Sequence, residues 1–278
     1  LGMTKEVHKG NGPAYWNWYK AEWDDTQALL NYSEKRGNPT ETERVGLYPQ
    51  DGAKIHMVGG HALGGTEEQS SGIWPTDYEC HTELPRMLAA GDCLNARAWG
   101  AIKNGAPWGI MPAMVEGKIA GRTAAKDAAK LDMPQVDEAY VDGLVAKMYG
   151  PLERVGGFES RWVDQLLNNC MSPYYVYQIK AEDRLKAALV QVEFFRDVMV
   201  PKIKAHDYHE LKMAHETKNM VFAAEAQLRS FLMRNESRGR HFREDYPEEN
   251  PEWAKWIRIR CKDGSMDLTT DDVPAEWI

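Results

Sequence analysis

Two apolar stripes with helical spacing, between residues 182 and 234, constrain the fold more than any other part of the sequence. Pro201 is expected to end or kink the first helix, because proline lacks a backbone N–H and clashes with the preceding turn. Asp207 and Glu210 have the spacing of a capping box, so Asp207 is the expected N-cap of a helix that runs to about Arg234. The expected core positions are Leu185, Leu189, Val192, Phe195 and Met199, then Leu211, Met220, Ala224, Leu228 and Phe231. Two or three such helices, packed antiparallel, form a small bundle.

Residues 57–130 differ from these helices because they are rich in glycine and alanine. The run RMLAAGD at 86–92 is typical of a buried strand that ends at Gly91. A helix follows to about Lys130, and Pro112, which is tolerated only in a first helical turn, places its start near Ile110. One face of this helix holds the small residues Gly117, Ala120, Gly121 and Ala124. Such a face permits close approach to a cofactor, and plain packing of a helix on a sheet explains it equally.

The composition is that of an ordinary globular chain of 278 residues, enough for about two domains. The chain has 34 basic and 42 acidic residues and a net charge of −8, which argues against a nucleic-acid partner, because binding phosphate requires a basic surface. We interpret the local basic cluster of Arg234, Arg238, Arg240 and Arg243 as solvated or paired charges. The sequence contains no run of 18 apolar residues, which is the length that a membrane-spanning helix requires.

The four cysteines, Cys80, Cys93, Cys170 and Cys261, are far apart and form no CxxC pair. Neither a metal site nor an iron–sulfur cluster built from this chain alone is therefore expected, and we interpret all four as inert core thiols. Scattered cysteines in an acidic chain that shows no apolar leader indicate a reducing, cytoplasmic setting. A first residue that is Leu1 rather than Met indicates a cut or incompletely known chain.

Three features could carry chemistry. A strand that ends in Gly91-Asp92 places a carboxylate at the edge of a sheet where ligands bind, and such a carboxylate can accept hydrogen bonds from ribose or ribityl hydroxyls. The helix that starts between Trp108 and Met111 offers free N–H groups and a positive dipole end, which would stabilise the negative N1–C2 edge of a reduced flavin. Finally, glycines on both sides of His61 let the backbone approach a planar ligand, and this histidine could polarise an anionic substrate.

The order of these pieces resembles the flavoprotein family of fumarate reductase and succinate dehydrogenase. That family has the patterns His-x-x-Met-Gly-Gly, Ala-Ala-Gly-Glu-Cys, Gly-Arg-Ile-Ala-Gly and Arg-x-Glu-Ser-Arg-Gly-x-His-x-Arg-x-Asp. The matching segments here are 61–65, 89–93, 117–121 and 233–247. The adenylylsulfate reductase α subunit looks closer within this superfamily, because EVHKGNGPAY, the SSGIW run at 70–74 and the layout of the helical region are similar to it. The resemblance covers nearly all of the chain.

The resemblance implies a partial α/β FAD-binding fold, with the N-terminal Rossmann half missing, followed by a C-terminal helical bundle. No GxGxxG fingerprint occurs in the sequence. The implied regions are the end of a capping (substrate) domain at 1–56, a returning segment of the FAD-binding domain at 57–130, the bundle at 131–235 and a C-terminal arm at 236–278. In the arm, Trp253, Trp256 and Trp277 are expected to pack on this chain or on a neighbouring subunit.

The resemblance also implies residue roles. His61 would face the substrate, and Lys103 is the nearest match to the substrate-binding arginine of the fumarate-type family. The implied FAD-binding residues are Gly60, Gly91, Asp92, Trp108, Gly109, Ile110 and Met111. A lysine is a point charge rather than a bidentate fork, so this substitution weakens the expectation of a dicarboxylate substrate. The His-Lys-Phe-Ser-Ser-Gly run of the adenylylsulfate type is absent as well.

The leading hypothesis is therefore an FAD-dependent oxidoreductase subunit of the adenylylsulfate reductase type. It would pass electrons between a small anionic substrate and iron–sulfur clusters on a ferredoxin-like partner, and it would need the missing N-terminal flavoprotein part. One alternative is an enzyme of the fumarate reductase or succinate dehydrogenase type. The other is a non-catalytic interaction subunit that keeps the fold without flavin.

Overall fold

The computed structural model describes residues 7–11, 14–17, 55–59, 72–94, 107–239 and 241–273. The chain divides into two compact units, residues 1–64 and 65–278. In the first unit, a π-helical turn η1 (Val7–Asn11) precedes an antiparallel pair of strands, β1 (Ala14–Asn17) and β2 (Ile55–Gly59). The second unit contains all the other elements named below.

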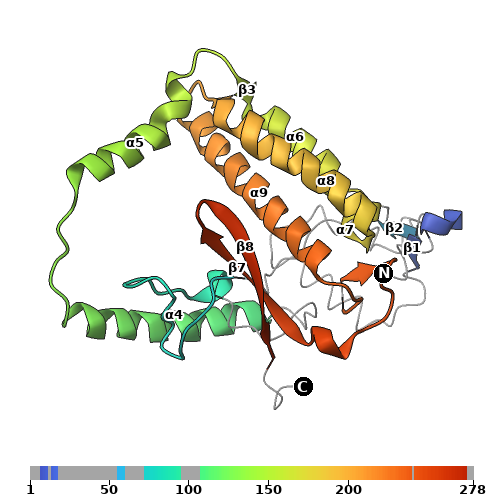
Figure 1. Ribbon diagram of the computed structural model, residues 1–278, viewed down its shortest axis with the longest axis horizontal. Helices are drawn as coiled ribbons and strands as arrows, with labels where there is room; N and C mark the ends of the chain where they lie inside the picture. Colours follow the sequence, from blue (N-terminus) through green and yellow to red (C-terminus); the bar gives the residue numbers. More distant parts are fainter. Residues whose placement is uncertain are drawn as a thin grey trace, which may run out of the picture. The chain divides into compact units, whose positions relative to one another are not determined.

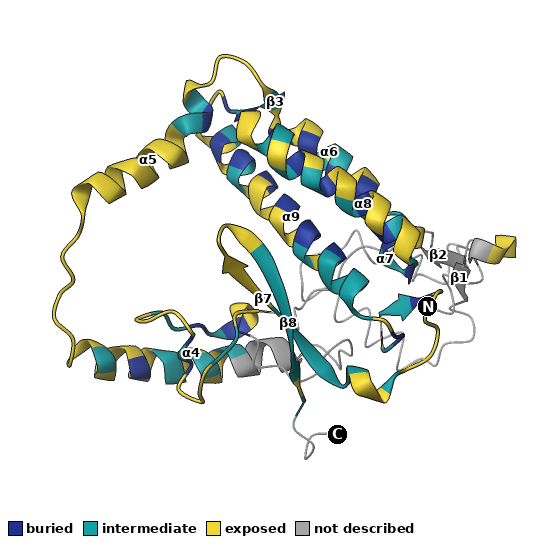
Figure 2. Ribbon diagram, in the orientation of Figure 1, coloured by how far each residue is buried: buried dark blue, intermediate teal, exposed yellow. Residues whose placement is uncertain are grey.

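The centre of the second unit is a bundle of three helices, α6 (Ser160–Met171), α8 (Glu182–Phe194) and α9 (Tyr208–Met233). Figure 1 shows them side by side, with α7 (Tyr174–Tyr177) at the end of α6. The helix α5 (Glu138–Glu153) contacts α9 near its own C-terminal end and is otherwise largely exposed (Figure 2). The predicted helical bundle is therefore confirmed.

The bundle core is apolar and matches most of the positions predicted from the sequence. Among those positions, the buried ones are Leu185, Val192, Phe195, Met199, Leu211, Ala224 and Leu228. Leu189 and Phe231 are partly buried against this core. The prediction for Met220 is wrong, because its side chain is 42% exposed. The buried stripe of α9 runs through Thr217 and Val221 instead, which turns the neighbouring position 220 toward solvent.

The connection from α8 to α9 follows the sequence signals closely. The chain leaves α8 through a π-helical turn η5 (Phe195–Met199) and a 3₁₀ turn η6 (Val200–Lys202), and Pro201 lies in that last turn, where the helix was expected to end. The Asp207 side chain accepts a hydrogen bond from the Glu210 N–H at 2.8 Å. Asp207 is therefore the N-cap of α9, as predicted.

Short parallel pairings and a hairpin complete this part of the fold. Strand β3 (Phe158–Glu159) pairs with β5 (Ile203–Lys204), and β4 (Ile179–Lys180) pairs with β6 (Phe242–Arg243). After a 3₁₀ turn η7 (Pro251–Trp253), strands β7 (Lys255–Lys262) and β8 (Ser265–Asp272) form an antiparallel hairpin. Its two-residue turn has positive φ at Asp263 and Gly264, the geometry of a type I′ turn.

Residues 72–94 and helix α4 (Pro107–Ala128) form a second, smaller packed region. The predicted buried strand at 86–91 is wrong, because Leu88 makes only an isolated bridge with His81. The chain then enters a 3₁₀ turn η4 (Gly91–Cys93) that lies against α4. No described residue extends this bridge into a sheet, so the segment stays an extended loop.

The start of α4 also differs from the prediction. The helix begins at Pro107, so Pro112 lies in its second turn rather than its first. A proline there removes one intrahelical hydrogen bond, whereas Pro107 takes the first position, where a missing N–H costs nothing. On the predicted small-residue face, Ala120 packs against the cluster of Cys80, Ala89 and Leu94. Gly117, Gly121 and Ala124 are exposed.

Candidate functional site

The η4 turn places the carboxylate predicted to bind a cofactor next to α4. Gly91 is buried and has φ +71°, a left-handed conformation that glycine adopts without strain. A Cβ built on Gly91 would lie 3.5 Å from the Cβ of Ala113, so the turn sits directly on the helix. Asp92 follows and is exposed. The turn that rests on α4 therefore sets where the Asp92 carboxylate lies along this helix.

The first turn of α4 supplies the second half of the candidate site. With Pro107 at the first helical position, the N–H groups of Trp108 and Gly109 have no partner within the helix, because residues four positions earlier lie outside it. At the rise of an α-helix, about 1.5 Å per residue, these two N–H groups lie roughly one turn along the axis from Ala113. Ile110 and Met111 stand deeper in the helix than the sequence analysis expected.

The Gly91 N–H is bound by a side chain that the sequence analysis missed. Glu116 of α4 accepts this hydrogen bond through Oε2 at 2.7 Å. The backbone carbonyl of the same residue also lies 3.8 Å from the Sγ of Cys80, which is buried. No sequence signal predicts this contact, because Glu116 and Gly91 are 25 positions apart and belong to different elements.

A histidine clamps the other end of α4 to the same loop. His81 Nδ1 lies 2.7 Å from Asp77 Oδ2, and His81 Nε2 lies 2.8 Å from Asp127 Oδ2. Hydrogen bonds to Asp127 and then to Asp77 raise the pKa of His81, and the bond to His81 lowers the pKa of Asp127. A ring that donates from both nitrogens is an imidazolium, so the clamp is complete only while His81 is protonated.

The C-terminal hairpin is attached to the same loop by ionic and aromatic contacts. Glu83 accepts from Arg258 at 3.2 Å and from Arg260 Nε at 2.9 Å. The Arg258 guanidinium lies 4.6 Å from the centre of the Trp74 ring, and Trp74 packs edge-on against Trp256 at 5.1 Å. Trp256 therefore packs on this chain, which was one of the two expectations for the C-terminal arm; the other was packing on a neighbouring subunit.

The segment that carries the last of the four family patterns, residues 234–245, forms a buried network of charges. Glu236, with 0% of its side chain exposed, bonds to Arg234 at 2.7 Å and to Arg238 at 2.9 Å. Arg243 is equally buried and pairs with Asp245 at 2.6 Å. The bond from Arg243 holds the pKa of Asp245 below its ordinary value. Three of the four arginines in the predicted basic cluster are thus paired, and Arg240 lies outside the described residues.

Two further basic groups are buried beside this network. Burial, and secondly the charge of Arg243, lower the pKa of Lys180 to about 8. The Lys180 Nζ lies 4.5 Å from the centre of the Phe231 ring, a cation–π contact. Burial, and secondly the charge of Lys180, lower the pKa of His241 to about 4, and His241 Nε2 lies 3.1 Å from the Arg234 carbonyl oxygen. These groups tie the end of α9 to β4 and β6.

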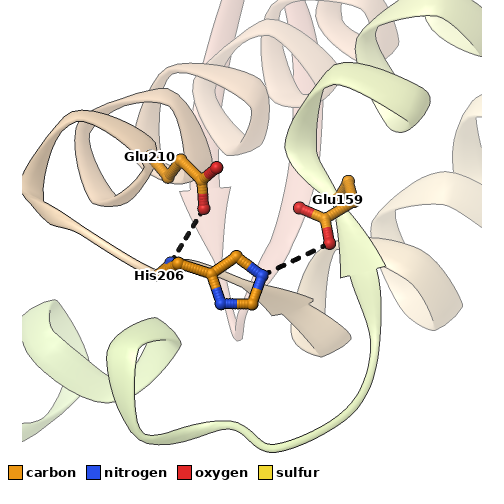
Figure 3. A group of neighbouring side chains, drawn as sticks. All are labelled: Glu159, His206 and Glu210. Carbon is orange, nitrogen blue, oxygen red and sulfur yellow. Dashed lines mark hydrogen bonds and ion pairs between the residues drawn. The ribbon is translucent and has the colours of Figure 1, made fainter.

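One group of described side chains has metal-ligand spacing. Glu159, His206 and Glu210 offer ligand atoms that lie within 4.8 Å of one another (Figure 3). Their present contacts explain them without an ion. Glu210 Oε2 accepts from the backbone N–H of His206 at 2.8 Å, and Glu159 pairs with Lys204 at 3.0 Å. Both carboxylates also lie at helix N-termini, where negative charge is favoured.

The remaining predicted residues lie beyond the described parts of the chain. His61, Gly60, Lys103 and Trp277 fall outside them, and for Trp108 to Met111 the structure describes only the backbone. Of the four cysteines, Cys80 and Cys170 are buried as expected, whereas Cys93 and Cys261 are exposed and are not core thiols. Among the described residues, no helix is both long enough and apolar enough to cross a lipid bilayer.

Comparison with known proteins gives the class to which this geometry corresponds. Residues 165–278 match the family described as fumarate reductase flavoprotein C-term. The matched residues include most of the bundle, the charge network and the hairpin, so this part of the chain is similar to the C-terminal region of that family. The resemblance predicted from the sequence is confirmed at this level.

Three relatives carry the comparison further. The chain is 30% identical over 185 residues to an uncharacterized FAD-dependent oxidoreductase of Methanocaldococcus jannaschii, covering 66% of this chain and 33% of the relative. It is 28% identical over 193 residues to a fumarate reductase (CoM/CoB) subunit of Methanothermobacter marburgensis, covering 65% and 33%. It is 26% identical over 197 residues to the succinate dehydrogenase flavoprotein subunit of Bacillus subtilis, covering 66% and 33%. The chain therefore spans about a third of the length of these relatives.

Solved structures agree on the fold. The FrdA chain of a variant E. coli quinol fumarate reductase superposes with a TM-score of 0.63 at 22% identity, covering 74% of this chain and 36% of that one. The Mycobacterium smegmatis Sdh1 complex in its apo form gives a TM-score of 0.53 at 23% identity, covering 66% and 32%. At these identities the likeness concerns the fold alone.

The described residues fit one side of a flavin nucleotide. The buried, left-handed Gly91 lets the chain turn on α4, with the exposed Asp92 next to it, and the N–H groups of Trp108 and Gly109, which have no partner within the helix, lie about one turn away toward the N-terminus of α4. A carboxylate suits sugar or ribityl hydroxyls, and a helix N-terminus suits an electron-rich ring edge. The phosphates would need a glycine-rich loop, and no GxGxxG occurs in this sequence.

Proposed function

We propose that this chain is part of an FAD-dependent oxidoreductase, in which the η4 turn and the start of α4 bind the flavin. The placement of Asp92 on a turn that rests on α4 carries this proposal. The similarity to fumarate reductase and succinate dehydrogenase flavoproteins supports it. Because the chain spans a third of those relatives, the phosphate-binding Rossmann part would come from sequence outside it.

FAD would supply two-electron transfer between a small substrate and an electron partner. This chain would orient the cofactor: Asp92 would accept bonds from its hydroxyls, and the N–H groups of Trp108 and Gly109 would face the ring edge that gains negative charge on reduction. His61 and Lys103 would supply positive charge or hydrogen bonds to an anionic substrate. We expect the electrons to pass to iron–sulfur clusters on a separate subunit, because the four cysteines include no CxxC pair.

Two substrate classes remain in competition. The adenylylsulfate type is favoured by the sequence around SSGIW. A lysine where the fumarate-type family has an arginine weakens the expectation of a dicarboxylate substrate. The dicarboxylate type is favoured by the relatives named fumarate reductase and succinate dehydrogenase. Reduction of the bound flavin by sulfite with AMP, compared with reduction by succinate, separates the two classes.

The test of the proposal is flavin binding by the purified flavoprotein that contains this chain. It should be yellow, with flavin absorbance bands, and the variant Asp92→Ala should bind FAD about tenfold more weakly, because one charge-assisted hydrogen bond is lost. Asp92→Glu should retain binding, since the carboxylate remains. Asp132→Ala, which removes an exposed carboxylate outside α4, is the matched control. A colourless protein that takes up no added FAD would overturn the proposal in favour of a non-catalytic subunit.

A further inference from the structure

Among the side chains that the structure describes on α4, Glu116 is bonded to the first residue of the η4 turn. Glu116 Oε2 accepts the Gly91 N–H at 2.7 Å. Gly91 is buried beside Ala113 with a φ of +71°, and its N–H points toward α4, as the bond to Glu116 shows. The next residue along the chain is Asp92. The position of Asp92 relative to α4 therefore depends on a bond made one residue away.

Besides the contact between Cys80 and the Glu116 carbonyl, two pairs of charged side chains join the same loop to α4 farther from this turn. His81 bonds to Asp127 at 2.8 Å, and Lys126 pairs with Glu79 at 3.2 Å. Both pairs lie at the C-terminal end of the helix, two to three turns beyond Glu116. They hold the loop against α4 without fixing the turn that carries Asp92.

We propose that Glu116 is a positioning residue for the flavin, which fixes the distance between the Asp92 carboxylate and the N-terminus of α4. This inference rests on the proposed function. Glu116 acts through Gly91 and does not itself touch the cofactor. FAD would bind most tightly if the Asp92 carboxylate and the N-terminus of α4 were already at the correct distance from each other. Any freedom of movement that binding must remove lowers the affinity for FAD.

The experiment measures the dissociation constant of FAD for the purified flavoprotein, by quenching of flavin fluorescence. Glu116→Leu removes the acceptor and keeps the side-chain volume, and it should weaken FAD binding about tenfold. Glu116→Gln keeps an oxygen that can accept the Gly91 N–H, and it should stay within about threefold of the wild type. Lys126→Ala, which breaks an exposed pair between the same two segments, should leave the affinity unchanged.

A second measurement needs no variant. The Gly91 amide of the wild-type protein should be strongly protected from hydrogen exchange, because its hydrogen is buried and bonded to a carboxylate. Either of two results would overturn the inference: rapid exchange at Gly91, or equal FAD affinity in Glu116→Leu and the wild type. A Glu116→Gln variant that fails as strongly as Glu116→Leu would also overturn it, because the acceptor would then not be the property that matters.

These outcomes separate this inference from the proposed function. A wild-type protein that binds no FAD defeats the proposed function, and the role of Glu116 falls with it. A wild-type protein that binds FAD, together with a Glu116→Leu variant that binds it equally well, leaves the proposed function intact and removes only the role of Glu116.

Discussion

The helical bundle and the α4 region are held together in different ways. The bundle buries a continuous apolar core from α6, α8 and α9. Among the described residues, the loop at 72–94 and α4 share a small core, in which Ile119 and Ala120 pack against Cys80, Ala89 and Leu94. Polar contacts through Glu116 and His81 add to it. Burial of apolar side chains therefore stabilises the bundle, whereas specific polar contacts hold the loop and α4 in place.

The largest expected effect lies in the buried charge network of residues 234–245. Glu236→Ala leaves Arg234 and Arg238 without their buried partner, so we expect the free energy of unfolding to fall by about 4 kcal/mol. Glu249→Ala removes a carboxylate that is 62% exposed and 3.4 Å from Arg238, and it should cost under about 1 kcal/mol. Urea denaturation followed by circular dichroism measures both, and equal losses would mean that the network is not buried as described.

The next effect concerns the apolar core of α9. Leu228 is completely buried, so Leu228→Ala should destabilise the protein by about 3 kcal/mol through lost contacts and a cavity. Met220 is 42% exposed, and Met220→Ala on the same helix should cost less than about 1 kcal/mol. Thermal unfolding compares the pair. A larger loss of stability for Met220→Ala than for Leu228→Ala would mean that Met220 is a core residue, as the sequence predicted.

A pH effect of about 2 kcal/mol should come from His241. Its pKa in the folded protein, about 4, is below the ordinary value of 6.5, so the unfolded chain takes up the proton first. The contribution is present above pH 6.5 and is lost progressively as the pH falls toward 4, at about 1.4 kcal/mol per pH unit. The difference in unfolding free energy between the wild type and His241→Gln should therefore change by about 2 kcal/mol from pH 6.5 to pH 5. A constant difference would show that His241 is not buried in neutral form.

The bundle was predictable from sequence, and the α4 region was less so, for a physical reason. Helical stripes, Pro201 and the Asp207 cap act within a few residues, so spacing alone located them. Met220 failed because one position, or about 100° of helical rotation, separates an exposed side chain from a buried one. The strand at 86–91 and the start of α4 depend on which segments are available to pair or pack with them, and local sequence does not specify that.

The smallest effect should appear at the His81 clamp. Asp127 contributes most to the raised pKa of His81 and Asp77 contributes next, so Asp127→Asn should lower that pKa more than Asp77→Asn does. The favourable contribution is complete below about pH 6.5, and it is lost as the pH rises through the raised pKa. An NMR titration of the His81 ring measures the order, and Asp132→Asn is the control. A larger decrease in the pKa of His81 for Asp77→Asn than for Asp127→Asn would contradict the contact between His81 and the end of α4.

We propose that FAD contacts the η4 turn and the first turn of α4 and does not contact the bundle. Hydrogen exchange in the purified flavoprotein, measured with FAD bound and with FAD removed, tests this directly. We predict that FAD slows exchange in residues 91–93 and 108–109 and leaves the buried stripe of α9 unchanged. Protection of neither segment by FAD, or the largest change in α9, would contradict this placement of the cofactor.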